Sequence, residues 1–484
     1  MRILGKVAGL LGLAGVLLLP LDSVQAGPKI ENWTTDQGLR VYFVAAPQLP
    51  MVDMRLTFAA GGARDGDKPG LAAMTVSMLD QGASGLNADQ LAEAFESVGA
   101  QFGSGAARDM AWVSLRTLTL ENEMKSALDT WLKVLARPDF PEKEFLNIQK
   151  MMLLDLQAEK QSPEAIGSKA FFPALFGDHP YASPANGTED SISAMTRTDL
   201  QDFFQRYYVS RNAVLAVVGA LDRTQVEAIA DRVSGVLAEG EKAPALPPVT
   251  PLAEARTIRI PFPSEQAHIT IGQTGYKKGD PDQFPLYLGN QILGGGSTSR
   301  LNKEIRQNRG LSYSVYSYFA SMGQDGPFIM GLQTRMDQTD EALKVMRETL
   351  ESYRTDGPSD NELEAAQKDI TGGFPLQTAS NDDIVSYLGM IGFYGLPLDY
   401  LDTFTANINA VSREAIVEAF QRRVQPDKLL TVIVGGGSEA AQAGAPADAG
   451  ATRADAPEDK PRSAIDIDAG EPEKTAAGTE AEAE

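Results

Sequence analysis

The stretches TRTDLQDFFQRYYVSRNAVLAVVG, residues 196–219, and SREAIVEAFQRRVQPDKLLTVIVG, residues 412–435, decide the fold because they repeat one pattern. Each predicts an amphipathic helix, a short turn and a buried strand that ends at glycine. Phe204-Gln205-Arg206 falls on Phe420-Gln421-Arg422 without a gap, at an offset of 216 residues (420 − 204). We therefore expect the two stretches to be equivalent ends of two repeated units.

The same offset connects earlier parts of the chain. Residues 52–58 alternate in polarity as a strand does, and 216 residues later residues 268–274 alternate as well. Two helices, expected at 123–135 and 341–350, are each followed by a proline-containing turn and a further helix. These matches predict two homologous α+β modules, each a mostly antiparallel sheet packed with helices. The modules are expected at residues 28–240 and 255–437.

Three further segments are expected outside the modules. Residues 241–254 are rich in proline and predict a semi-rigid linker. Residues 438–484 contain mainly Ala, Gly, Pro and acidic residues, which predicts a disordered acidic tail that only solvates the protein. Residues 1–26 predict a signal peptide, because a positive end precedes a short apolar run and the small-x-small site Val24-Gln25-Ala26.

Cleavage after Ala26 predicts export to a bacterial periplasm, or secretion, without a membrane anchor. The alternative, an uncleaved anchor, is less consistent with the short apolar run. The net charge of −22 argues against nucleic acid as a partner. The chain has no cysteine, which excludes disulfides, thiolate metal sites and thiol nucleophiles.

Several motifs in this order resemble the pitrilysin/insulinase family of zinc peptidases, the inverted zincins. The stretch AAGGARDGDKPGLAA, residues 59–73, resembles the family's strand, acidic loop and the start of its first long helix. Residues 176–181 resemble the loop before the final helix, and residues 207–219 the strand that follows it. The resemblance extends to about Gly436 and implies the α+β fold of mitochondrial processing peptidase and the metalloenzyme LuxS.

The zinc motif of that family is missing. Active members carry H-x-x-E-H on the first helix, in which two histidines bind zinc and the glutamate polarises water. The matching positions here are Ala73, Val76 and Ser77, none of which binds zinc tightly. For the family's third ligand, a glutamate, the best match is Asp155, and its register is not fixed. We therefore expect no zinc and no other cofactor in this chain.

Other catalytic sites have little support in the sequence. His179 and His268 are the only histidines and lie far apart in the chain, so an independent zinc site is not expected. An all-oxygen Ca²⁺ or Mg²⁺ site stays open, although no EF-hand spacing is present. The stretch GGGSTS, residues 294–299, has no histidine partner for a serine nucleophile and resembles a glycine-rich turn of the family.

The second module retains one element of the family's chemistry. Residues 300–315 resemble its R-x6-Y element, whose arginine and tyrosine hold the substrate backbone and the developing oxyanion. The matching residues are Arg306 and Tyr313, with Arg309 as a competitor for the arginine role. A guanidinium and a phenol are donors suited to such an oxygen. The alternative is that Arg306 is a solvated charge and Tyr313 an ordinary strand residue.

These features lead to two main hypotheses. In the first, the chain is the non-zinc subunit of a heterodimer and completes the active site of a zinc-bearing homologous subunit in trans. A peptide substrate would pair with a sheet edge. In the second, it is a non-enzymatic peptide-binding or scaffold subunit. A third reading, a peptidase with substitute ligands, has the least support.

Overall fold

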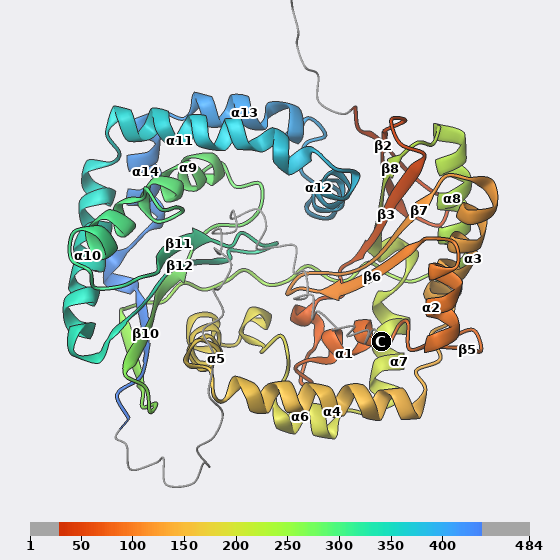
Figure 1. Ribbon diagram of the computed structural model, residues 1–484, viewed down its shortest axis with the longest axis horizontal. Helices are drawn as coiled ribbons and strands as arrows, with labels where there is room; N and C mark the ends of the chain where they lie inside the picture. The colour runs from red at the N-terminus through yellow and green to blue at the C-terminus, as the bar shows by residue number, and fades with distance from the viewer. Residues whose placement is uncertain (1–28, 438–484) are drawn as a thin grey trace, which may run out of the picture.

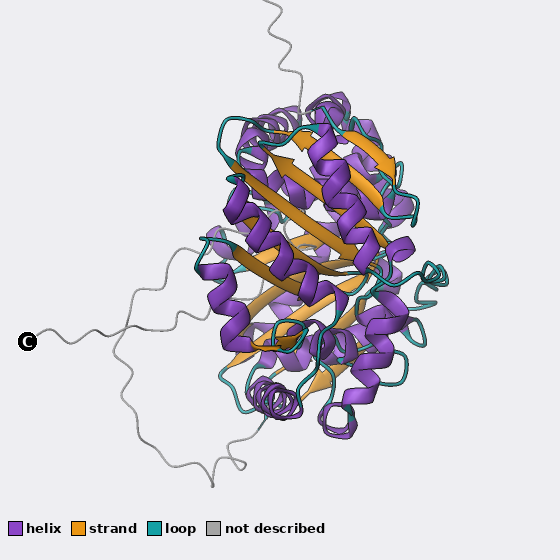
Figure 2. Ribbon diagram, turned by 90° about the vertical axis from the view of Figure 1, so that its right-hand side faces the viewer, coloured by secondary structure: helices purple, strands orange, loops and turns teal. Residues whose placement is uncertain are grey.

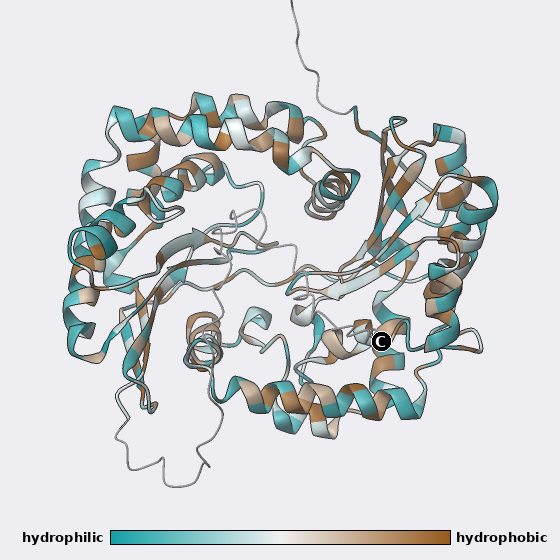
Figure 3. Ribbon diagram, viewed as in Figure 1, coloured by the Kyte–Doolittle hydropathy of each residue, from teal (hydrophilic) through white to brown (hydrophobic). Residues whose placement is uncertain are grey.

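The computed structural model describes residues 29–437 of the 484-residue chain. The predicted signal peptide and acidic tail lie outside these residues. Two sheets lie side by side with helices around them (Figures 1 and 2). Hydrophilic and hydrophobic residues alternate along the outer helices, as they do in helices with one buried face (Figure 3). No helix of residues 29–437 has the length and apolar character needed to cross a membrane.

The first module has a six-stranded sheet in the order β1-β2-β8-β3-β7-β6, antiparallel except for the β2–β8 pair. Its strands are β1 Glu31–Thr34, β2 Arg40–Ala45, β3 Met51–Phe58, β6 Gln101–Ala106, β7 Ala111–Leu118 and β8 Ala213–Gly219. A small hairpin joins β4 Gly82–Ala83 and β5 Leu86–Asn87. Its helices are α1 Leu71–Ser77, α2 Ala88–Glu96, α3 Glu121–Ala136, α4 Glu142–Glu159, α5 Pro163–Phe176, α6 Glu189–Ala194, α7 Arg197–Tyr207 and α8 Arg223–Val236.

The second module has a five-stranded sheet in the order β11-β12-β10-β13-β9, antiparallel except for the β13–β9 pair. Its strands are β9 Arg256–Ile260, β10 Gln266–Thr274, β11 Val315–Phe319, β12 Pro327–Arg335 and β13 Leu430–Val434. Its helices are α9 Gln283–Leu293, the π-helix η4 Asn302–Gln307, α10 Thr339–Asp356, α11 Asp360–Gly373, α12 Asn381–Tyr394, α13 Tyr400–Ala410 and α14 Arg413–Arg423.

The predicted repeat is confirmed element by element. Strands β3 and β10 occupy equivalent places, and each pairs antiparallel with the buried strand of its repeated stretch, β8 or β13. Helices α3 and α10, and helices α7 and α14, are also equivalent. The expected fold class is therefore correct. One detail is wrong: the first helix was expected to be long, but α1 ends at Ser77, and the chain then turns toward the β4–β5 hairpin.

The two modules exchange a helix. Helix α5 of the first module packs on the sheet of the second, where Phe171 shares a buried cluster with Val432 and Val434. Helix α12 of the second module packs on the sheet of the first, where Leu388 shares a cluster with Val214. Each sheet therefore buries one face against the other module. This reciprocal packing joins the modules into one body.

A polar junction reinforces this packing. Asp109, in the β6–β7 turn, is buried, and its carboxylate accepts hydrogen bonds from both modules. From the first module the donor is the Tyr181 hydroxyl, at 2.6 Å. From the second the donors are the Gly323 N–H, at 2.6 Å, and the Tyr394 hydroxyl, at 3.0 Å. A buried carboxylate needs such donors, so this residue depends on the contact between the modules.

The linker runs against the protein rather than away from it. Residues 241–254 form neither helix nor strand, as their prolines predict. Leu246 and Leu252 pack against the buried cluster that includes Phe171 of α5. The Pro247 carbonyl lies 2.9 Å from His179 Nε2. The linker is thus held in place beside the exchanged helix.

Candidate functional site

Helix α1, which resembles the family's zinc helix, is capped by a buried aspartate from the preceding loop. Gly70 precedes the helix in the left-handed region, with a φ of +89°, and supplies no side-chain cap. Asp65 takes over this role. Its Oδ2 accepts from the Gly70 N–H and its Oδ1 from the Ala72 N–H, both at 2.8 Å. The apolar side chains of α1 and of the two residues that follow it are buried: Leu71, Met74, Met78 and Leu79.

Burial of Asp65 gives a testable pH dependence. Desolvation raises the pKa of its carboxyl to about 7, against the two backbone hydrogen bonds that lower it. In the unfolded chain this pKa is about 3.9. The contribution of Asp65 to stability is therefore fully present below about pH 4 and is lost as pH rises through about 7.

We expect the Asp65→Asn variant to lose the part of the pH dependence of stability that Asp65 causes. Between pH 4 and 7 the wild-type free energy of unfolding should fall more steeply than that of the variant, by up to about 4 kcal/mol for three pKa units. Urea titrations of both proteins at each pH measure this difference. Parallel pH profiles would contradict it.

The three positions of the lost zinc motif do not share one environment. Ala73 is half-buried and Ser77 is exposed, and the Ser77 hydroxyl donates to the Ala73 carbonyl at 2.9 Å. Val76 is only 4% exposed and belongs to the core of the first module. A methyl, an isopropyl and an internally bonded hydroxyl do not fit zinc. No catalytic step on this chain can therefore be assigned to a zinc ion at α1.

The other ligand candidates lie apart. Asp155 is exposed on α4. Both ring nitrogens of His179 are engaged: Nε2 donates to the Pro247 carbonyl, and Nδ1 accepts from the Tyr181 N–H at 3.1 Å. His268 is buried under α5, where burial lowers its pKa. Within residues 29–437, no three His, Asp or Glu side chains are grouped so that they could hold a metal ion.

The structure brings Arg306 and Tyr313 together. Arg306 is an exposed residue of the π-helix η4, a conformation that often marks functional sites. Its guanidinium carbon lies 4.3 Å from the centroid of the Tyr313 ring. Tyr313 is 81% exposed and precedes strand β11. The pair thus presents a cation and a phenol at one place on the surface.

Internal hydrogen bonds fix the loop that carries this pair. Gly310 has a φ of +61°, and its N–H donates to the Arg306 carbonyl at 3.1 Å. The buried Thr334 hydroxyl donates to the Leu311 carbonyl at 2.6 Å. Tyr313 follows two residues later, so its exposed ring stands on a fixed backbone.

Arg309 is engaged elsewhere. Its guanidinium donates to the Glu304 carbonyl at 2.9 Å and forms an ion pair with the Glu304 carboxylate. Arg306 is therefore the arginine of this segment that stacks on Tyr313. Arg309 makes a matched control, since it has the same charge on the same turn.

The GGGSTS turn has a structural role. The Gly294 carbonyl accepts from the Ser317 N–H at 3.0 Å, and the Asn290 side chain bonds the Ser317 carbonyl and hydroxyl. Ser299 is 2% exposed, too buried to act as a nucleophile. The turn covers part of the outer edge of β11, which limits pairing there.

Two models of known protein families match the sequence of this chain. One, described as Insulinase (Peptidase family M16), matches residues 40–189. The other, described as Peptidase M16 inactive domain, matches residues 194–370. Together they span more than half of the chain. The chain belongs to the insulinase (M16) peptidase family. The description of the second model as an inactive domain concerns residues 194–370, and the zinc ligands are missing separately, on α1.

The relatives of this chain include proteins named as zinc proteases and a protein named as a non-peptidase homolog. The uncharacterized zinc protease YmxG of Bacillus subtilis is 24% identical over 84% of this chain and 98% of its own length. The non-peptidase homolog YmxG of Helicobacter pylori is 25% identical over 80% and 89%. A crystal structure of a peptidase M16 inactive domain from Pseudomonas fluorescens has a TM-score of 0.81 and 38% identity, covering 84% of this chain and 97% of that one.

Proposed function

We propose that this chain is the non-zinc subunit of a two-chain metallopeptidase. It acts in an exported location, the periplasm or the medium, after cleavage behind Ala26. A homologous partner supplies H-x-x-E-H and zinc, and Arg306 and Tyr313 contact the peptide carbonyl in trans. The observation that carries the proposal is the stacked, exposed Arg306–Tyr313 pair in a chain whose α1 cannot hold zinc.

The packing of the modules supports a second chain. Helices α5 and α12 each lie on the sheet of the opposite module, so the modules cannot separate without exposing both buried faces. A closed space around a peptide therefore needs another protein. Donors that point at a developing oxyanion are effective when water is excluded, and the partner would cover the exposed Tyr313.

A sheet edge supports peptide binding. Strand β6 ends its sheet, lies beside α1 and has the sequence QFGSGA, without charge or proline. Charged residues and proline normally protect an edge from pairing with another chain, and β6 has neither. An extended peptide added to β6 would gain main-chain hydrogen bonds with little dependence on its sequence.

Co-expression with an H-x-x-E-H homologue tests the role in trans. With a quenched fluorescent peptide, Arg306→Ala and Tyr313→Phe are each expected to lower kcat by about 10²–10³, the usual cost of losing one oxyanion donor. Arg309→Ala should leave turnover within a few-fold. If the complex cleaves peptides and both test variants match the wild type, the catalytic role is refuted.

The second candidate is a peptide-binding subunit without catalysis, which the non-peptidase homolog of Helicobacter pylori favours. Titration calorimetry of the complex with a peptide distinguishes the two. Binding that persists in the Arg306 and Tyr313 variants, in a complex that never turns over, would support the second candidate.

A further inference from the structure

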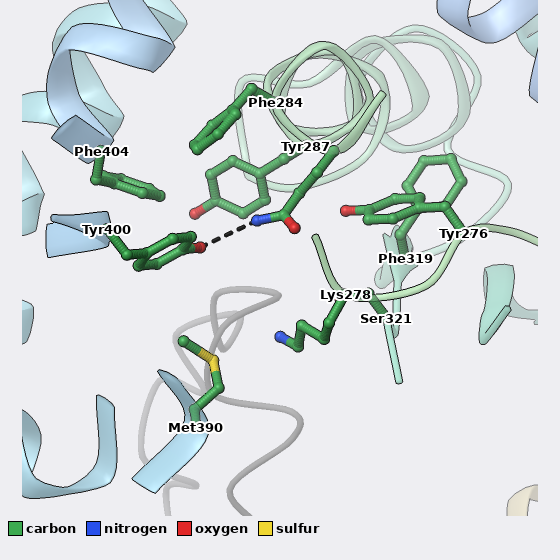
Figure 4. A pocket seen from close by; sticks show the side chains of 10 residues that line it. Tyr276, Lys278, Phe284, Tyr287, Phe319, Ser321, Met390, Tyr400 and Phe404 are labelled. Atoms are coloured by element: carbon green, nitrogen blue, oxygen red, sulfur yellow. Dashed lines mark hydrogen bonds between the residues drawn. The ribbon is translucent and has the colours of Figure 1, made fainter. Parts of the chain in front are cut away.

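An aromatic hollow of the second module, beside the exchanged helix α12, is closed by its own side chains. Phe284, Phe319 and Phe404 form much of its wall, and Met390 of α12 lies at one side (Figure 4). The space left inside is about 20 Å³, room for a single water. The apolar surface of this hollow is therefore covered within the chain, unlike that of helix α4 in the first module.

Helix α4 carries an apolar stripe on its outer face. The helix runs along the lower edge of the first module in Figure 1. Its inner side chains, such as Phe145 and Leu156, are buried in the core of that module. On the outer face Leu146, Met151 and Leu154 are 51%, 58% and 59% exposed. Single exposed apolar residues are common on soluble proteins, but three on one helix face indicate a contact surface.

The spacing of the outer residues is that of a coiled-coil seam. Exposed positions follow one another at intervals of four, three and four residues: Asn147, Met151, Leu154 and Ala158. A line with this spacing stays on one side of an α-helix and packs against the same line of a second helix. Met151 and Leu154 are its apolar centre, and Leu146 lies at its rim.

Charged residues of opposite sign flank this seam. Lys150 lies on one side of Met151 and Leu154, and Asp155 lies on the other. Both are exposed, and neither forms an ion pair with another residue of the described range 29–437. They are five residues apart (155 − 150), the spacing of the two flanking positions that pair between parallel helices of a coiled coil.

These charges determine which helix fits the seam. In a parallel pair about a two-fold axis along α4, the Lys150 side of each helix meets the Asp155 side of the other. In an antiparallel pair each side meets itself, so Lys143 and Lys150 would approach the same lysines of the second helix, which is unfavourable. The outer face of α4 is thus complementary to a second copy of itself in the parallel orientation.

We propose that α4 is a contact between two copies of this chain, packed in parallel about a two-fold axis. Met151 and Leu154 each meet their own copy, and Lys150 pairs with the partner's Asp155. The helix is already held in its module, so association costs no helix folding. A single helix pair buries less than about 1,200 Å², so the dimer should be weak and reversible. This proposal does not rest on the proposed function.

Single cysteines test the arrangement because the chain has none of its own. In the full chain, Met151→Cys and Leu154→Cys should each form a disulfide with the same position of a second copy, since only a parallel pair brings both positions onto their own copies. Leu376→Cys is the control, at an apolar position of the second module that is 77% exposed. Under mild oxidation we expect disulfide-linked dimers about tenfold faster at 151 and 154 than at 376.

Sedimentation velocity of the cysteine-free chain tests the same contact without a covalent bond. The mean mass should rise with protein concentration toward that of a dimer, and Leu154→Glu should abolish this rise. Lys150→Glu should weaken association roughly fivefold, because two exposed ion pairs are lost. Reversing both charges, by Lys150→Glu with Asp155→Lys, should restore the wild-type association.

Three outcomes would overturn the proposal. The first is a monomer mass at every concentration, with equal cross-linking rates at 154 and 376. The second is a disulfide that forms only between a Met151→Cys chain and a Leu154→Cys chain, because that pairing requires antiparallel helices. The third is a dimer that Leu154→Glu and Lys150→Glu leave unchanged, since another surface would then hold it.

Discussion

Replacing Asp109 by alanine is expected to lower the free energy of unfolding by about 3–5 kcal/mol, because three hydrogen bonds to a buried carboxylate are lost together. The donors come from Tyr181, Gly323 and Tyr394, so both modules lose an acceptor at their junction. Few single substitutions away from the hydrophobic core should have a larger effect.

Chemical denaturation followed by circular dichroism measures this loss. Asp178→Ala is the matched control, since Asp178 is an exposed carboxylate in the loop that leads to Tyr181, and it should change stability by less than about 0.5 kcal/mol. Asp109→Asn keeps one acceptor oxygen and should fall between the two. A loss for Asp109→Ala no greater than the control would show that the hydrogen bonds of Asp109 do not stabilise the contact between the modules.

The repeat was visible in the sequence because strands and helices have different periods. Alternation marked β3 and β10, and apolar residues at helical spacing marked α3 and α10. The exchange of α5 and α12 was not visible. Periodicity shows which residues of a helix are buried, but it does not show which sheet buries them. That information lies in contacts between residues more than a hundred positions apart.

The site was only partly predictable for a similar reason. The spacing of Arg306 and Tyr313 came from a family motif, whereas their stacking depends on the π-helix and on the Thr334 hydrogen bond. The role of Asp65 was also missed. A side chain that caps a helix five residues later depends on the turn between them, and the stretch had been noted only as an acidic loop.

The lost zinc motif gives the second large prediction. Ala73 and Ser77 are one helical turn apart on the accessible side of α1, so Ala73→His with Ser77→His should create a zinc-chelating pair. We expect the double variant to bind Zn²⁺ more tightly than either single variant by on the order of a hundredfold, about 2.7 kcal/mol. Competition with a chelating dye measures this, and stoichiometric tightly bound zinc in the wild type would contradict our assignment.

Peptidase activity should not return with the metal, and the reason lies at Val76. Its side chain is 4% exposed in the core, so Val76→Glu would bury a carboxylate and cost several kcal/mol, on the order of 2–4. The two ligand positions stayed at the surface, where a histidine can be restored, but the position of the catalytic base has become part of the core. If the triple variant Ala73→His, Val76→Glu, Ser77→His is as stable as the double variant and cleaves peptides alone, α1 is an intact catalytic helix that lacks only its side chains. We expect it to be destabilised and inactive, because the helix now packs for folding and no longer for catalysis.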